Sequence, residues 1–386
     1  MPRATAPMLL PNSLRPGLVM PDIASNSPPA LGVYIHWPYC ARICPYCDFN
    51  IYKNSPGHED KLVAAIVESL KYWREISGPR PISSIHFGGG TPSLLSANNM
   101  ATLVATTTEL WPLASDLEVG LEANPKDVSR GNVRGWRAAG IERLSLGVQS
   151  FDDQVLNFLG RDHSANMARK ATDMVCEIMP RTSLDLIYGW RGQSLEHWQG
   201  ELEMAVEIGV GHVSTYQLTI EEKTAFAKAQ GRGNIKTVDD DRSADLYELA
   251  VAYMTRSGFD YYEVSNAAKD RAHQSRHNLL YWQGGDYVGV GPGAHGRLTV
   301  GGARHALIAP LKPHDYGQIS PAQKYDFSEA TALSPQAWAQ EYVLMGLRIS
   351  QGVRVQKIQE ICGQSLDQST IDNFVKDGLL QQKTGR

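Results

Sequence analysis

Three cysteines lie within eight residues of this chain, at the spacing C-x3-C-x2-C: Cys40, Cys44 and Cys47. Three thiolates on one short loop can each hold one iron of a four-iron cluster. The fourth iron then has no protein ligand, so a small molecule can bind to it. The spacing therefore predicts a 4Fe-4S cluster with one iron open to a ligand.

Cysteines at short spacings also bind zinc, and His36 could complete a tetrahedral site with the three thiolates. Structural zinc sites usually take their ligands from two separated pairs, however. His36 also falls within a predicted strand, so its side chain would have to reverse direction to reach the loop. Disulfides are disfavoured, because the chain has five cysteines, an odd number, and no recognisable secretory signal. The cluster is the favoured interpretation and zinc remains the alternative.

The charge and hydropathy of the chain limit its partners. With 37 basic and 41 acidic residues, the formal net charge is −4, which does not attract nucleic acid. No apolar run approaches the length of a membrane span. We therefore expect a cytoplasmic protein without a nucleic-acid partner or a membrane span, and a transient contact with a membrane protein is compatible with this composition. Residues 1–28 are rich in proline, lack any regular period and are expected to be disordered.

From residue 31 onward, segments with apolar alternation of period two are separated by segments of helical period. For example, Leu62, Ile66, Leu70 and Trp73 form a helical stripe between the first two strands. Parallel strands joined by helices predict an α/β fold, either a barrel or an open sheet. The six predicted strands are residues 32–37, 83–87, 117–121, 143–148, 183–187 and 212–218.

Polar residues stand at the carboxyl ends of these strands, where the active sites of such barrels lie. A glycine run, residues 88–90, follows the second strand, and Glu122, Gln149, Asp185 and Tyr216 close or follow later ones. A carboxylate suits ribose hydroxyls, an amide suits a base edge or an amino acid, and glycines let a zwitterion approach the backbone. One molecule, S-adenosylmethionine, has all these groups.

With these motifs the sequence resembles the radical SAM superfamily and, more closely, the group of oxygen-independent coproporphyrinogen III oxidases. The resemblance implies a partial (β/α)6 radical SAM barrel within residues 29–302, followed by a small, mostly helical C-terminal domain in residues 303–386. Beyond the cysteine loop it is carried by residues 34–40, 88–93, 145–151, 159–163 and 262–266.

The resemblance also assigns roles to individual residues. It implies that Cys40, Cys44 and Cys47 bind the 4Fe-4S cluster, and that S-adenosylmethionine occupies the open iron. Reduced flavodoxin or ferredoxin would supply the electron that cleaves the sulfonium. The S-adenosylmethionine pocket implied by the resemblance consists of Tyr34, Tyr46, Gly89, Gly90, Thr91, Glu122, Gln149, Arg161 and Asp185.

The group contains true oxidases and haem chaperones, and two features separate them. The oxidases continue the cysteine motif as C-x3-C-x2-C-x-C, whereas this chain has Phe49 at the last position. His277, Tyr281 and Trp282, in H-N-x-x-Y-W, resemble a haem-binding motif of the chaperone branch; histidine can ligate haem iron and aromatic rings can bury the macrocycle. The resemblance thus implies a chaperone that binds haem b and passes it to acceptor haemoproteins such as respiratory cytochromes. A coproporphyrinogen oxidase remains the alternative.

Residues 289–294 contain G-x-G-x-x-A, part of the dinucleotide-binding fingerprint. Pro292 removes a backbone N–H that a phosphate would need, and no helical stripe follows. We predict instead a tight loop after a strand at residues 287–290, with His295 as a secondary candidate for haem ligation. The helices expected after residue 337 could suggest a DNA-binding fold, but no basic face is visible in them.

Overall fold

The computed structural model describes residues 17–19, 29–54, 57–325, 327 and 331–383. Its main feature is an eleven-stranded sheet with the strand order β10-β11-β9-β8-β7-β6-β5-β2-β12-β13-β14. The six strands predicted from the sequence lie next to one another in this order, all parallel, and confirm the predicted partial barrel. Their bounds are β2 Leu31–Trp37, β5 Ile82–Gly89, β6 Leu113–Ala123, β7 Arg143–Gln149, β8 Arg181–Tyr188 and β9 His212–Gln217.

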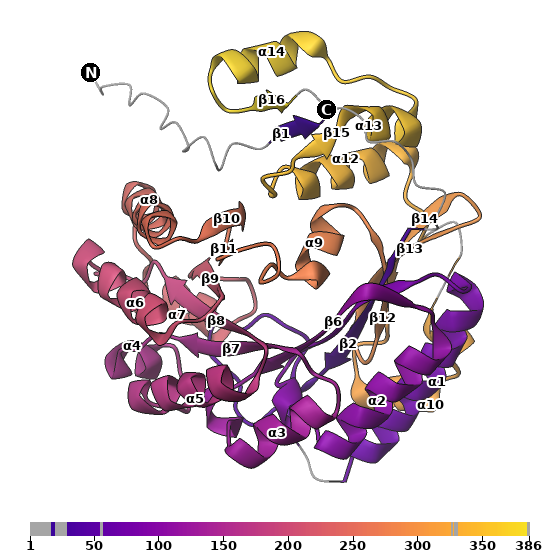
Figure 1. Cartoon of the computed structure of the whole chain (residues 1–386), viewed down its shortest axis with the longest axis horizontal. Helices are drawn as coiled ribbons and strands as arrows, with labels where there is room; N and C mark the ends of the chain where they lie inside the picture. The colour runs from indigo at the N-terminus through magenta and orange to yellow at the C-terminus, as the bar shows by residue number, and fades with distance from the viewer. Residues whose placement is uncertain (1–16, 20–28, 55–56, 326, 328–330, 384–386) are drawn as a thin grey trace.

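Helices cover the convex face of the sheet (Figure 1). Several begin at a serine whose hydroxyl accepts a backbone N–H of the first turn, as Ser96, Ser129, Ser164 and Ser194 do. These caps fix the residue at which each of these helices begins. The helices of this layer are α1 Glu59–Ser77, α2 Ala97–Leu110, α3 Arg130–Ala138, α4 Asp153–Phe158, α5 Ala165–Ile178, α6 Leu195–Ile208 and α8 Asp240–Arg256.

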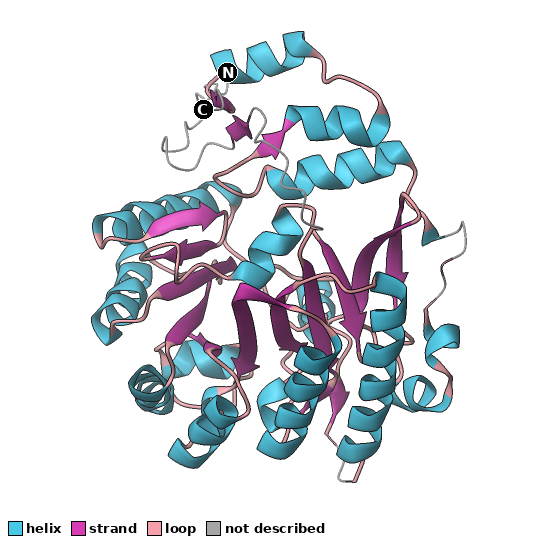
Figure 2. Ribbon diagram, turned by 45° about the vertical axis from the view of Figure 1, so that its right-hand side comes forward, coloured by secondary structure: helices cyan, strands magenta, loops and turns pink. Residues whose placement is uncertain are grey.

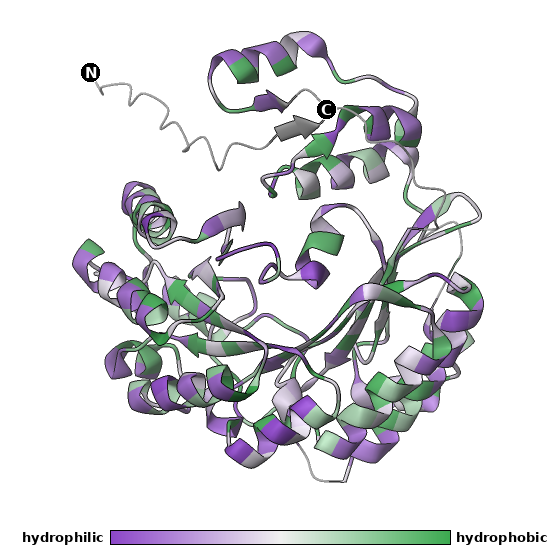
Figure 3. Cartoon of the chain, in the orientation of Figure 1, coloured by the Kyte–Doolittle hydropathy of each residue, from purple (hydrophilic) through white to green (hydrophobic). Residues whose placement is uncertain are grey.

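Alternation along the strands gives the sheet two different faces. In β2, Leu31, Val33 and Ile35 are fully buried in the core formed with the helices. The intervening residues face the concave side, and there they are polar. Figure 3 shows the hydrophobic stretches along the strands. The polar set on the concave face consists of Tyr34, His36, Ser84, His86, Glu118, Glu122, Arg143, Ser145, Ser183, Asp185, His212 and Ser214.

The sheet extends beyond the six parallel strands at both edges. The predicted strand near residue 287 is β12 (Asp286–Val290), which pairs parallel to β2. The predicted tight loop follows it, with Gly291 at φ 101° and Gly293 at φ 79°. The added antiparallel strands are β13 His295–Val300, β14 Ala303–Ile308, β11 Asn266–Ala268 and β10 Asp260–Glu263.

One short helix, α9 (Arg276–Trp282), lies on the concave face of the sheet (Figures 1 and 2). Its first turn is held by Glu118 of β6, whose carboxylate accepts the backbone N–H groups of Arg276 and His277, each at 3.1 Å. Ser275 caps the helix by accepting the N–H of Asn278. The segment that carries H-N-x-x-Y-W is thereby fixed against the polar face of the sheet.

The C-terminal region is mostly helical, and its last three helices pack a small core of their own, which includes Tyr342, Val353, Ile358 and Ile371. Its helices are α10 Pro313–Gln318, α11 Pro321–Lys324, α12 Pro335–Gly346, α13 Val355–Cys362 and α14 Gln368–Lys376. The division at residue 303 stays a prediction, and it would separate β14 from β13, its partner in the sheet.

Within residues 1–28, the structure describes residues 17–19 alone. They form β1 (Gly17–Val19), which pairs parallel with β15 (Val353–Arg354) and β16 (Gln381–Lys383). Local periodicity could not reveal this pairing, because the partner strands lie more than 300 residues away in sequence, and the expected disorder of the extension stays a prediction. The other residues of the predicted extension lie outside the described part. Among the described residues, every helix is too short or too polar to span a bilayer.

Candidate functional site

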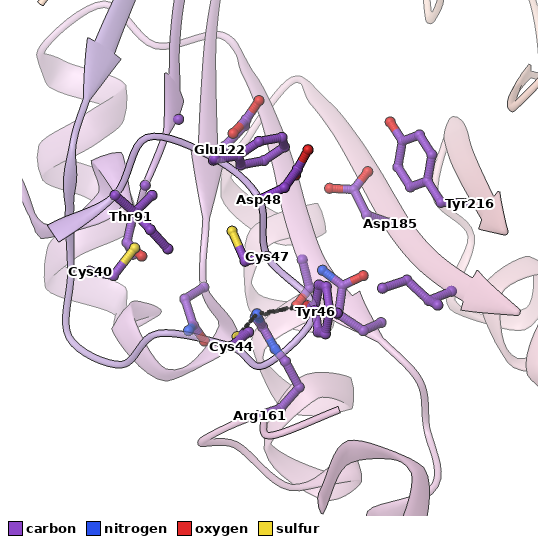
Figure 4. A pocket seen from close by; sticks show the side chains of 18 of the residues that line it. Cys40, Cys44, Tyr46, Cys47, Asp48, Thr91, Glu122, Arg161, Asp185 and Tyr216 are labelled. Atoms are coloured by element: carbon purple, nitrogen blue, oxygen red, sulfur yellow. Dashed lines mark hydrogen bonds between the residues drawn. The ribbon is translucent and has the colours of Figure 1, made fainter. Parts of the chain in front are cut away.

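A cavity of about 460 Å³ lies at the carboxyl ends of the parallel strands. It brings together the three cysteines and most of the predicted pocket residues, which come from different strand ends (Figure 4). Arg42, Asp48, Phe49 and Tyr216 add to its wall. The predicted residues that line the cavity are Cys40, Cys44, Cys47, Tyr46, Gly89, Gly90, Thr91, Glu122, Gln149, Arg161 and Asp185.

The cysteine loop leaves the sheet after β2 and is closed by a short parallel pair, β3 (Tyr39–Cys40) and β4 (Tyr52–Lys53). All three cysteines are free thiols. Burial raises the pKa of Cys40, and it raises the pKa of Cys47 to about 11. These thiols therefore stay neutral near pH 7 unless a bound cation stabilises the thiolates.

The arrangement fits the donor set of an iron–sulfur cluster, because three thiols from one loop face a cavity with room for further ligands. Among the residues that the structure describes, no three Cys, His, Asp or Glu side chains form a site for a single metal ion. His36, the fourth ligand of the zinc alternative, lies outside the cavity wall. Its ring nitrogens bond to the Tyr34 hydroxyl and the Asn50 carbonyl, each at 3.0 Å.

The glycine run brings the backbone of β5 against the cysteine loop. The N–H of Gly90 donates to the Trp37 carbonyl at 2.7 Å, and the N–H of Thr91 donates to the Tyr39 carbonyl at 2.9 Å. A Cβ on Gly90 would lie 2.8 Å from both carbonyl oxygens, and Gly89 has φ 103°. A side chain at Gly90 would thus force the loop away from the strand, and one at Gly89 would be strained and would collide with the ring of His36. The glycines fix where the cysteines stand relative to the cavity.

Arg161 lies at the wall of the cavity beside the cysteine loop. Its guanidinium donates to the Gly147 carbonyl at 2.9 Å and reaches Sγ of Cys44 at 3.4 Å and the hydroxyl of Tyr46 at 3.5 Å (Figure 4). It therefore places a positive charge next to one of the thiols.

Two carboxylates face the cavity from neighbouring parts of the sheet. Glu122 is 41% exposed, and its Oε1 bonds to Nε2 of His86 at 3.0 Å. Asp185 accepts a hydrogen bond from Ser145 at 3.1 Å. Burial, together with the nearby charge of Glu122, raises the pKa of Asp185 to about 6. Gln149 closes β7 with φ 68°, a left-handed conformation that turns the chain at the end of the strand.

Tyr34 is the one predicted pocket residue that is missing from the cavity wall. It is packed inside the concave face, with its ring stacked on His86 and His277 at centroid distances of 6.4 and 5.9 Å.

The residues of the haem motif lie on α9, apart from the cysteine cavity. His277 is 2% exposed, and both its ring nitrogens are bonded, Nδ1 to Ser84 at 3.1 Å and Nε2 to the hydroxyl of Tyr281. Burial lowers the pKa of His277 well below its usual value, so the ring is neutral. Trp282 packs under the guanidinium of Arg348, which lies 4.5 Å from the ring centroid. The secondary candidate, His295, is exposed at the start of β13.

Sequence reasoning missed the polar residues that hold the pocket side chains from behind. His86 bonds to Glu122, and Ser145 donates to Asp185. A signal for them exists in the sequence, because both fall on the polar side of strands whose other side is apolar.

Comparisons with known proteins agree with this geometry. The model of the radical SAM superfamily matches residues 34–205. Heme chaperone HemW of Bacillus subtilis (strain 168) is 32% identical over 352 residues, which cover 90% of this chain and 92% of that protein. The mitochondrial radical S-adenosyl methionine domain-containing protein 1 of Bos taurus is 37% identical over 333 residues, covering 85% of this chain and 75% of that protein.

The fold has a counterpart among solved structures. The structure of coproporphyrinogen III oxidase (HemN) from Escherichia coli, a radical SAM enzyme, matches with a TM-score of 0.70 over 94% of this chain and 82% of that chain, at 20% identity. This structural similarity shows the radical SAM fold, and the sequence relatives show the family within that superfamily. The chain therefore belongs to the radical SAM superfamily and, within it, to the family of the heme chaperone HemW.

Proposed function

We propose that this protein is a cytoplasmic haem chaperone of the radical SAM type. It binds a 4Fe-4S cluster, S-adenosylmethionine and haem b, and it delivers haem to acceptor haemoproteins such as respiratory cytochromes. The proposal rests on the sequence similarity to HemW, which extends over nearly the whole length of that protein. It is supported by a cavity whose wall contains three thiols and several polar side chains. Phe49, 60% exposed at the cavity, stands where the oxidases have a further cysteine.

Cys40, Cys44 and Cys47 would hold the cluster, which supplies a reducing electron when it is loaded. Reduced flavodoxin or ferredoxin is the proposed electron donor. Glu122 presents carboxylate oxygens that can accept the two ribose hydroxyls of S-adenosylmethionine. Gly89, Gly90 and Thr91, with the other wall residues, would surround its methionine part.

His277 is the proposed haem ligand, with Tyr281 and Trp282 beside the macrocycle. Because the hydroxyl of Tyr281 bonds to Nε2 of His277, this bond must break before the imidazole can ligate iron through that nitrogen. We expect that His277→Ala weakens haem binding or changes the Soret band while the cluster content is unchanged. Identical spectra and affinity would remove His277 from the proposal.

A coproporphyrinogen III oxidase is the second candidate, because the fold matches that of HemN. One assay separates the two. Anaerobically reconstituted protein is given coproporphyrinogen III, S-adenosylmethionine and a reductant. We expect haem binding without turnover, and the appearance of protoporphyrinogen IX would overturn the chaperone assignment. Electron paramagnetic resonance with and without S-adenosylmethionine then tests whether this cofactor binds the cluster, in which case the signal shifts.

A further inference from the structure

One buried histidine connects the two proposed ligand sites. His86 lies on the concave side of β5, its side chain is 7% exposed, and it bonds through Nε2 to Glu122 of the cavity wall at 3.0 Å. On its other side its ring stacks on His277 of α9, with ring centroids 4.4 Å apart and ring planes 11° apart. Thus one side chain contacts both the proposed ribose-binding carboxylate and the proposed haem ligand.

The hydrogen bond sets the direction of the Glu122 carboxylate. An ionised carboxylate only accepts hydrogen bonds, so the N–H of His86 Nε2 donates to it and holds Oε1. Oε2 remains available to a ligand. The carboxylate of Glu122 is tightly packed at this point, because a Cβ on Gly88 would lie only 3.0 Å from its Oε1.

The stack holds the imidazole of His277 in place. His277 has both ring nitrogens bonded within the protein, to Ser84 and Tyr281, and its ring lies flat against His86. Iron could reach a ring nitrogen only after the imidazole leaves at least one of these partners. Because His277 is also only 2% exposed, a macrocycle cannot approach either nitrogen while the ring is in this place, so a haem-ligated His277 moves out and loses its stacking on His86.

We propose that His86 is a positioning residue that orients Glu122 toward the cavity and ties it to α9. When S-adenosylmethionine binds in the cavity, it holds Glu122 in place, and through the hydrogen bond it also holds His86. It therefore favours the state in which His277 stays stacked on His86. Haem ligation by His277 favours the opposite state. The two ligands therefore weaken each other's binding, and by linkage the factor is the same in both directions. This inference rests on the proposed function, because it assumes that the protein binds both ligands.

Two substitutions separate the two contacts of His86. His86→Gln keeps an N–H donor near the position of Nε2 but removes the aromatic ring. His86→Phe keeps a flat ring against His277 but removes the donor. Calorimetric titration of S-adenosylmethionine into cluster-loaded protein, without haem and with saturating haem, gives both the affinity and the mutual effect.

In the wild type we expect haem to weaken S-adenosylmethionine binding by about fivefold or more. His86→Phe should weaken S-adenosylmethionine binding by about fivefold or more without haem, since Glu122 loses its donor. His86→Gln should restore that affinity to within about twofold of the wild type yet lose the mutual effect. A purely structural role for His86 would not produce this division.

The outcomes also distinguish the inference from the proposed function. If the wild type binds both ligands without mutual effect, or if His86→Phe binds S-adenosylmethionine as the wild type does, the role of His86 is refuted while the chaperone assignment stands. The wild-type titration needs no variant, so it decides even if a variant folds poorly. If loaded wild-type protein binds no S-adenosylmethionine, the proposed function fails and this inference fails with it.

Discussion

The guanidinium of Arg161 reaches Sγ of Cys44 at 3.4 Å, so a partly buried cation contacts one of the three thiols that face the cavity. The same side chain also reaches the Tyr46 hydroxyl and donates to the Gly147 carbonyl, contacts that hold it in place. The contact joins the loop after β2 to the segment after α4, which are more than 100 residues apart in sequence.

This contact predicts an effect on the reduction potential of the proposed cluster. Potentials of iron–sulfur clusters depend on net charge and on hydrogen bonds to sulfur, and a nearby cation stabilises the more negative, reduced state. Arg161→Gln should therefore lower the midpoint potential, measured by electron paramagnetic resonance during an anaerobic redox titration without S-adenosylmethionine. Lys126→Gln removes the same charge from an exposed side chain and serves as the control. Equal potentials for Arg161→Gln and the wild type would contradict the prediction.

Glu122 is the residue of the cavity wall that should matter most for the ribose of S-adenosylmethionine. Glu122→Ala removes the acceptor and leaves the N–H of His86 without its partner. We expect binding of S-adenosylmethionine to weaken by roughly 1–3 kcal/mol. Calorimetry on cluster-loaded protein measures it, with Glu109→Ala on the exposed side of α2 as the matched control. Unchanged affinity of Glu122→Ala would exclude the assigned role.

The sequence predicted most of the barrel because its signals are local. Leu31, Val33 and Ile35 alternate with polar residues along one strand, and Ser96 caps a helix through its own next turn. Such patterns need no knowledge of distant segments. The same reasoning placed Glu122 and Asp185 at strand ends, and both line the cavity.

What the sequence could not predict depends on contacts between distant segments. The motif H-N-x-x-Y-W can be recognised in the sequence, but nothing local indicates that α9 lies on the concave face of the sheet. Glu118, which accepts the backbone N–H of Arg276 there, precedes it by 158 residues. The pairing of β1 with β15 is of the same kind. Tyr34 differs in another way: it does face the concave side, but there it packs against histidines instead of lining the cavity.

Asp185 should make the stability of the protein depend on pH. Burial raises its pKa in the folded state to about 6, above the usual value of 3.8. The folded state then holds the proton more tightly, so the ionised carboxylate costs stability above about pH 6, and this cost disappears as pH falls toward 4. Asp185→Asn should therefore raise the free energy of unfolding by on the order of 1–3 kcal/mol at pH 8. It should give no gain near pH 4.

Urea denaturation between pH 4 and pH 8 checks the prediction for Asp185. Asp372→Asn changes a carboxylate on the small C-terminal helix α14, where the side chain is exposed, and should show no such pH dependence. If Asp185→Asn raises the free energy of unfolding equally at the lowest and the highest pH, titration of this carboxyl is not the cause.

Glu118 provides the last prediction, since it is the buried anchor of α9. It is 0% exposed, lies 2.8 Å from Arg181 and accepts two N–H groups from the first turn of the helix. Burial alone would raise its pKa, but Arg143, Arg181 and these N–H groups lower it overall. Its stabilising effect is therefore present above the unfolded-state pKa of 4.5 and is lost as pH falls below it.

Glu118→Gln leaves the cation of Arg181 partly uncompensated, so we expect a loss of about 3 kcal/mol in the free energy of unfolding at pH 7. Glu177→Gln breaks an exposed ion pair with Arg130 and should leave the free energy of unfolding close to that of the wild type. Hydrogen exchange locates the effect: amides of residues 276–282 should exchange faster in Glu118→Gln than in Glu177→Gln. If both variants protect these amides equally, Glu118 does not hold α9 on the sheet, and the position of the haem motif must depend on its contacts with His86 and Ser84 instead.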